Sequence, residues 1–71
     1  MDRISVESSS LASVGYEPDT SKLEVEFNTG EVYQYSGVPT NVYDGLMAAP
    51  SKGKYFDRYV KKAGYEYDHV S

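Results

Sequence analysis

Two neighbouring stretches of the chain alternate between apolar and polar residues, and this alternation is the strongest constraint on the fold. In KLEVEF, residues 22–27, Leu23, Val25 and Phe27 fall on one side and charged residues on the other. LASVGYE, residues 11–17, alternates in the same way. Because successive side chains of a β-strand point to opposite faces, both stretches are predicted to be half-buried strands.

The connection PDTS, residues 18–21, favours a tight turn between these strands. Proline fixes φ, and the aspartate side chain can hydrogen-bond back to the chain. A four-residue loop places Glu17 opposite Lys22 and Tyr16 opposite Leu23, so the charges pair and the apolar faces agree.

The next connection decides which way the tyrosines of EVYQY, residues 31–35, point. A two-residue loop sends Tyr33 and Tyr35 to the polar face of the sheet, whereas a three-residue loop turns them to the apolar face. The three-residue loop is favoured, since it asks for positive φ only at Gly30 and not at the β-branched Thr29. Packing is then the first role of both tyrosines, with their hydroxyls near a rim.

This choice gives the sheet one apolar and one polar face. The apolar face collects eight side chains: Ala12, Val14, Tyr16, Leu23, Val25, Phe27, Tyr33 and Tyr35. Glu24 and Glu26 share the other face, which we expect to be open to solvent.

After Gly37 the apolar spacing changes to a helical period, which predicts a helix over about residues 40–49. Thr40 or Asn41 is its candidate N-cap, and Pro50 ends it. Gly45 weakens this helix by roughly 1 kcal/mol relative to alanine, so packing has to supply the difference.

A second helix is predicted for SKGKYFDRYVKK, residues 51–62, with Ser51 as its N-cap. Four residues form its apolar stripe: Tyr55, Phe56, Tyr59 and Val60. Residues 63–71 are too short to decide between an extended tail and a final edge strand.

The predicted fold class is α+β, a three-stranded antiparallel β-meander followed by two short α-helices packed on one face. Seventy-one residues form one domain, with a core over about 4–62 and a short C-terminal tail over 63–71. The chain has no cysteine and no cluster of metal ligands, so we expect no disulfide, metal site or cofactor. It lacks a signal peptide and an apolar span, which favours a cytoplasmic protein without a membrane partner.

The charge is unevenly distributed along the chain. The formal net charge is −4, which argues against a long nucleic-acid groove. Five of the seven cations nevertheless lie within residues 52–62, beside several aromatic residues. One local cluster of this kind suits one or two phosphates.

Taken together, SSSLASVGYEPDTSKLEVEFNTGEVYQYSGVP, VYDGLMAA and SKGKYF resemble the KTSC domain, over roughly residues 4–62. This module occurs at the C-terminus of some lysyl-tRNA synthetases and as a stand-alone protein. The resemblance implies a small binding module and, through the synthetases, an RNA ligand. The chain departs from the family pattern at Asp57, where asparagine is common, and in its acidic tail, and both changes weaken the attraction for a polyanion.

We therefore expect a non-enzymatic binding module for a nucleotide-type ligand, either an RNA segment or a small nucleotide. The candidate ligand-binding residues are Tyr33, Tyr35, Ser51, Lys52, Gly53, Lys54, Tyr55 and Arg58. The alternative is a protein interaction or self-assembly module that uses an exposed edge of the meander, as a homo-oligomer or in association with a larger protein. No catalytic residue is predicted, because His69 is the only histidine and has no nucleophile or orienting carboxylate identifiable beside it.

Overall fold

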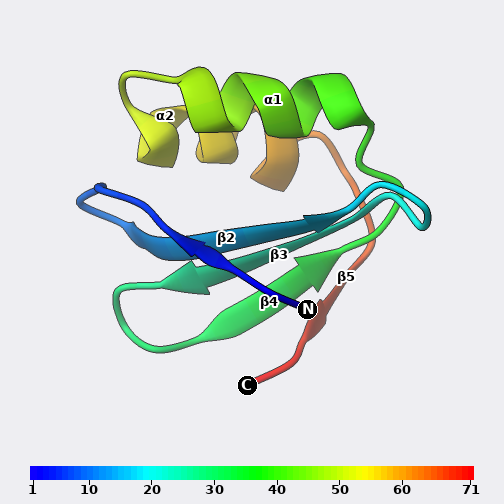
Figure 1. Ribbon diagram of the computed structural model, residues 1–71, viewed down its shortest axis with the longest axis horizontal. Helices are drawn as coiled ribbons and strands as arrows, with labels where there is room; N and C mark the ends of the chain where they lie inside the picture. Colours follow the sequence, from blue (N-terminus) through cyan, green and yellow to red (C-terminus); the bar gives the residue numbers. More distant parts are fainter.

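The computed structural model describes residues 1–71 and places a helical layer over one face of an antiparallel sheet (Figure 1). The strands are β1 (Ile4–Ser5), β2 (Leu11–Glu17), β3 (Lys22–Phe27), β4 (Val32–Tyr35) and β5 (Tyr67–His69). The helical segments are α1 (Thr40–Ala48), α2 (Lys52–Phe56) and η1 (Asp57–Lys61), a π-helical turn that continues α2. The α+β class is confirmed. None of the helices combines the length and the apolar character needed to span a bilayer.

The sheet has five strands in the order β1-β2-β3-β4-β5, and not the three strands that were predicted. The two additional strands cover the edges of β2 and β4, which the prediction left exposed. Both are too short, at two and three residues, for an alternating pattern to identify them. Residues 63–71 therefore include an edge strand, which was one of the two alternatives for this segment.

The predicted register of the central strands is confirmed. Glu17 stands opposite Lys22, and Tyr33 stands opposite Val25. The β3–β4 connection is the three-residue loop, closed by a hydrogen bond from the Phe27 amide to the Glu31 carbonyl (2.9 Å). Its glycine has a φ of 95°, the conformation that this loop requires.

One assignment to the predicted apolar face, that of Ala12, is wrong. The pairing of β2 with β3 shifts between Leu11 and Ser13, so Ala12 is an extra residue in a β-bulge. Leu11 stands opposite Phe27 and is 1% exposed, in the core position that alternation assigned to Ala12.

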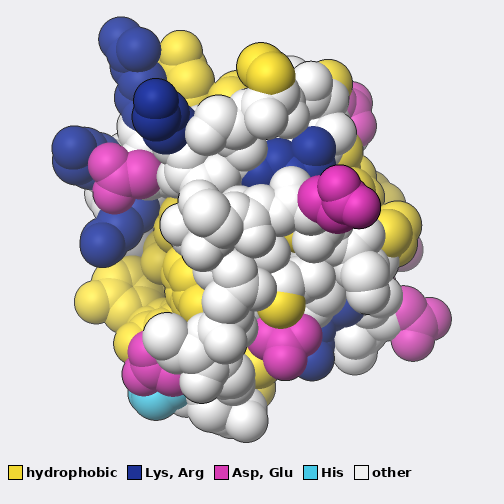
Figure 2. Space-filling model, turned by 90° about the vertical axis from the view of Figure 1, so that its left-hand side faces the viewer, with side chains coloured by type: hydrophobic (Ala, Val, Ile, Leu, Met, Phe, Trp, Pro, Cys, Tyr) yellow, Lys and Arg dark blue, Asp and Glu magenta, His cyan; other side chains and the backbone are white.

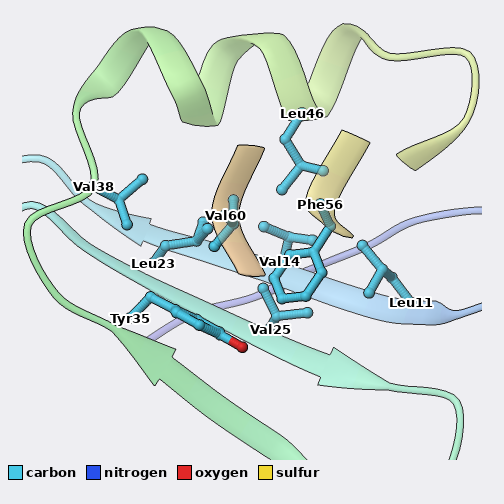
Figure 3. Packing of buried hydrophobic residues seen from close by; sticks show 9 residues of the cluster. All are labelled: Leu11, Val14, Leu23, Val25, Tyr35, Val38, Leu46, Phe56 and Val60. Carbon is cyan, nitrogen blue, oxygen red and sulfur yellow. The ribbon is translucent and has the colours of Figure 1, made fainter. Parts of the chain in front are cut away.

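The core lies between the sheet and the helices and is made of nine buried side chains (Figure 3). These are Leu11, Val14, Leu23, Val25, Tyr35, Val38, Leu46, Phe56 and Val60. From the second helix only Phe56 and Val60 reach the core, whereas Tyr59 of the predicted stripe is 47% exposed. Tyr59 instead lies beside Tyr55, with the two ring centroids 4.6 Å apart.

The helix starts differ from the predicted caps. The residue at the N-cap of α1 is Pro39, so neither Thr40 nor Asn41 caps this helix. Ser51 occupies the N-cap position of α2, as predicted, but its hydroxyl makes no capping hydrogen bond.

The polar face of the sheet is partly covered, and not open as expected. The N-terminal segment crosses it, and the Arg3 guanidinium bonds Glu24 (2.5 Å) and the Ser13 hydroxyl (2.9 Å). Glu24 is only 6% exposed as a result. Gly15 allows this crossing, because a Cβ there would lie 2.5 Å from the backbone carbonyl oxygen of Asp2.

Gly45 is explained by the contact between α1 and α2. A Cβ at this position would lie 2.1 Å from the Tyr55 hydroxyl and 2.7 Å from its ring. We predict that Gly45→Ala destabilises the protein even though alanine favours helix by about 1 kcal/mol. In a Tyr55→Ala background the same change should be neutral or stabilising. Denaturant unfolding of the four proteins measures this reversal of sign, and a Gly45→Ala protein as stable as the parent would contradict it.

The partly buried Arg3–Glu24 ion pair should contribute more to stability than the exposed Lys62–Asp57 pair. Arg3→Ala leaves the Glu24 carboxylate without its cation, and we expect a loss of about 1–3 kcal/mol in the free energy of unfolding. Lys62→Ala is the matched control, because the Lys62–Asp57 pair is largely exposed and such pairs contribute about 1 kcal/mol or less. Equal losses in the two variants would show that the cover over Glu24 is not stabilising.

Candidate ligand-binding groove

Two adjoining hollows lie where α2 and η1 meet the sheet, and Phe27 and Lys61 line both of them. The first, the serine hollow, has a volume of about 420 Å³. Its polar lining consists of Ser9, Ser10, Ser51, Lys54, Asp57 and Lys61. The second, the aromatic hollow, has a volume of about 500 Å³. Its lining consists of Phe27, Thr29, Glu31, Tyr33, Tyr35, Lys61 and Tyr67. Together they form the groove.

The serine hollow depends on a turn before β2 that approaches the start of α2. The Ser8 hydroxyl holds this turn by accepting hydrogen bonds from the amides of Ser10 (3.1 Å) and Leu11 (3.2 Å). On the other side, a Cβ at Gly53 would lie 3.1 Å from the Ser10 hydroxyl, so glycine permits the close approach. The result is a concave surface lined by serines, two lysines and the Asp57 carboxylate.

The aromatic hollow is built from one face of β4 and from β5. Alternation along the chain places Glu31, Tyr33 and Tyr35 on the same side. Tyr67 of β5 stands opposite Tyr35, with ring centroids 5.4 Å apart, and lies 5.7 Å from the Tyr33 ring. Tyr35 is 5% exposed and Tyr67 is 60% exposed, so the hollow has a buried floor and an accessible aromatic wall.

Burial raises the pKa of Tyr35 above its ordinary value of 10.0, and the neighbouring Tyr67 and Tyr33 raise it further. The Tyr35 hydroxyl therefore stays protonated at neutral pH. The pKa of Tyr55 is also raised, by burial and then by Tyr59 and Tyr65, although Tyr55 lines neither hollow.

The rim of the aromatic hollow carries the His69 ring of β5 and the Glu31 carboxylate, which precedes β4. The His69 ring stacks on Tyr33 with centroids 4.6 Å apart and an angle of 10° between the planes. Its Nε2 lies 3.9 Å from Glu31 Oε2. The other Glu31 oxygen accepts a long hydrogen bond (3.4 Å) from the Thr29 hydroxyl.

Positive charge gathers at the helical side of the groove. Figure 2 shows lysine and arginine side chains above a hydrophobic patch, with the single histidine below it. Lys54 and Lys61 line the groove. Asp57 lowers the net positive charge there, but it also pairs with Lys62 at 3.1 Å. No group of three or more His, Asp or Glu side chains is placed to hold a metal ion.

Sequence reasoning named eight site residues, and the structure brings five of them together. These five line the groove: Tyr33, Tyr35, Ser51, Gly53 and Lys54. The other three lie outside it. The Lys52 ammonium donates a hydrogen bond to the Ala49 carbonyl (3.1 Å), and the Arg58 guanidinium lies over the Tyr59 ring at 5.7 Å. Tyr55 packs against α1.

Lys61, Tyr67 and the serine turn also line the groove but were not among the eight predicted site residues, although Lys61 belongs to the predicted cation cluster. Lys61 follows Lys54 by seven residues, a spacing that places two side chains on one side of a helix, so this signal was available. Tyr67 could be predicted as a site residue only if residues 67–69 were assigned to a strand beside β4. The approach of the serine turn to Gly53 has no local sequence signal.

Comparison with known proteins gives concordant results. The family described as KTSC domain matches residues 7–67. A protein of Stutzerimonas stutzeri is 43% identical over 67 residues, which cover 94% of each chain. A lysine–tRNA ligase of a Nostoc species is 40% identical over 65 residues, covering 92% of this chain and 11% of the ligase.

A solved structure shares the whole fold. The crystal structure of a KTSC domain protein from Yersinia pestis aligns with a TM-score of 0.92 and 37% sequence identity. The alignment covers 99% of this chain and 97% of that protein. The chain therefore belongs to the KTSC domain family.

Proposed function

We propose that this protein is a non-enzymatic binding module for a nucleotide-type ligand, either a single-stranded RNA segment or a small nucleotide, which it holds in the groove. The observation that carries the proposal is the position of Lys61. This side chain lines both hollows, so a lysine lies between the serine hollow and the tyrosine rings of the aromatic hollow. A nucleotide also has two such ends, a phosphate that suits the serine hollow and a planar base that suits the aromatic hollow.

The aromatic hollow supplies the surface for the base. Stacking of a base on an aromatic side chain is worth about 1–3 kcal/mol and does not depend strongly on which base is bound. Tyr67 offers an accessible ring for this contact, and Tyr33 lies beside it. Tyr33 itself is held by His69 on one face and by the Phe27 ring at 5.7 Å, so the platform is ordered before a ligand arrives.

The serine hollow supplies the contacts for phosphate. Lys54 and Lys61 provide charge, and the hydroxyls of the serine turn and of Ser51 provide hydrogen bonds. The net charge of −4 favours a short ligand with one or two phosphates in contact over a long duplex, which needs a continuous basic face.

The relatives support RNA as one form of the ligand. In the lysine–tRNA ligases the matching segment is part of a much longer protein whose name specifies tRNA as a substrate. This is an argument from context, and it extends to an association of this chain with a larger protein. A sheet-edge interaction module has less support, because the outer edges are now β1 and β5, with two and three residues.

Neutralising the groove lysines tests the phosphate contacts. We expect Lys54→Gln and Lys61→Gln each to weaken binding to a short single-stranded RNA about fivefold, since an exposed charge contact contributes about 1 kcal/mol. Each should also reduce the slope of log K against log salt by about 0.7. Arg58→Gln is the matched control, because it removes one positive charge from the same helical segment but lines neither hollow.

Fluorescence anisotropy with labelled RNA, and calorimetry with a panel of nucleoside monophosphates, measure these effects. The protein must first be freed of co-purified nucleic acid. Absence of low-salt binding to both the RNA and the whole panel would falsify the proposed function. Equal losses in Lys61→Gln and Arg58→Gln would show that binding is not located in the groove.

Replacing an accessible tyrosine tests the stacking contact. Tyr67→Leu keeps an apolar side chain but removes the ring, and we expect binding about tenfold weaker. Tyr59→Leu is the control, because Tyr59 is exposed to a similar extent but lies outside the groove. Melting temperatures of both variants separate lost binding from lost folding. A Tyr67→Leu protein that is folded and binds like the parent would rule out stacking on this ring.

A further inference from the structure

We infer that the aromatic hollow selects guanine among the nucleobases, and that Glu31 determines this specificity. The inference rests on the proposed function, and it adds the identity of the base. Inside the hollow, the Glu31 carboxylate is the one acidic group among three tyrosine rings.

Glu31 is positioned by the strand itself. It lies on the same side of the chain as Tyr33, two residues away, and directly after the loop of residues 28–30. A base lying against the tyrosine rings would therefore present its edge to this side chain.

The Glu31 carboxylate keeps most of its hydrogen-bonding capacity for a ligand. Its side chain is 54% exposed. One oxygen accepts only the long bond from Thr29 (3.4 Å), and the other lies 3.9 Å from His69 Nε2, beyond hydrogen-bonding distance. An ionised carboxylate can only accept hydrogen bonds, through two oxygens side by side.

Among the four common bases, guanine alone matches two adjacent acceptors. Its Watson–Crick edge carries N1–H and N2–H next to each other, so both can donate to one carboxylate, and hydrogen bonds to an ionised group are the stronger ones. Adenine and cytosine have a ring nitrogen acceptor beside their amino group, which the carboxylate repels. Uracil has a single N–H between two carbonyl oxygens.

Calorimetric titrations with GMP, IMP, AMP, CMP and UMP test the inference on the full chain. We expect GMP to bind about tenfold more tightly than AMP, CMP and UMP, because one bidentate contact distinguishes them. IMP lacks the N2 amino group and should fall between GMP and the others.

Two variants locate the selectivity. Glu31→Gln should remove the preference for GMP over AMP, because the side-chain amide offers one acceptor and one donor in place of two acceptors. Glu66→Gln removes the same charge from an exposed position outside the groove and should keep the preference.

The outcomes separate the two proposals. Equal binding of all five nucleotides, or a GMP preference that survives in Glu31→Gln, overturns the assignment of selectivity to Glu31 and leaves nucleotide binding in place. Binding of none of the five, and of no RNA, overturns both.

Discussion

The three-residue loop between β3 and β4 is the local structure on which both the core and the groove depend. Because Gly30 accepts a positive φ, Tyr33 and Tyr35 point to the helical side of the sheet. A shift by one residue would send both rings to the face that carries Glu24. The core would then lose Tyr35, and the aromatic hollow would lose its floor.

The central architecture was predictable from sequence because each strand carries a clear period of two. The alternation in residues 22–27 and the turn residues around it determine the register, and the glycine at position 30 distinguishes the two possible loops. The helical segments were also predicted to within a few residues, because their apolar residues recur at a regular helical spacing.

The predictions were wrong or incomplete where a residue depends on a distant segment. Alternation alone could not show the β-bulge at Ala12, which puts Leu11 in the core position predicted for Ala12. Nor could it show that Arg3 would cover Glu24, because β1 has only two residues. In the groove, the serine turn reaches Gly53 across more than forty residues of sequence, and such an approach has no local pattern.

The π-helical turn η1 has a consequence for the groove. Its defining hydrogen bond runs from the Lys62 amide to the Asp57 carbonyl (3.1 Å), and the side chains of the same two residues form an ion pair. Each residue after Asp57 is therefore rotated relative to an unbroken α-helix. Lys61 lines the two hollows, whereas its neighbour Lys62 is largely exposed and pairs with Asp57. A change in the winding of this turn would reorient both lysines together, so the charge that the helix presents to a ligand depends on the path of the main chain as well as on composition.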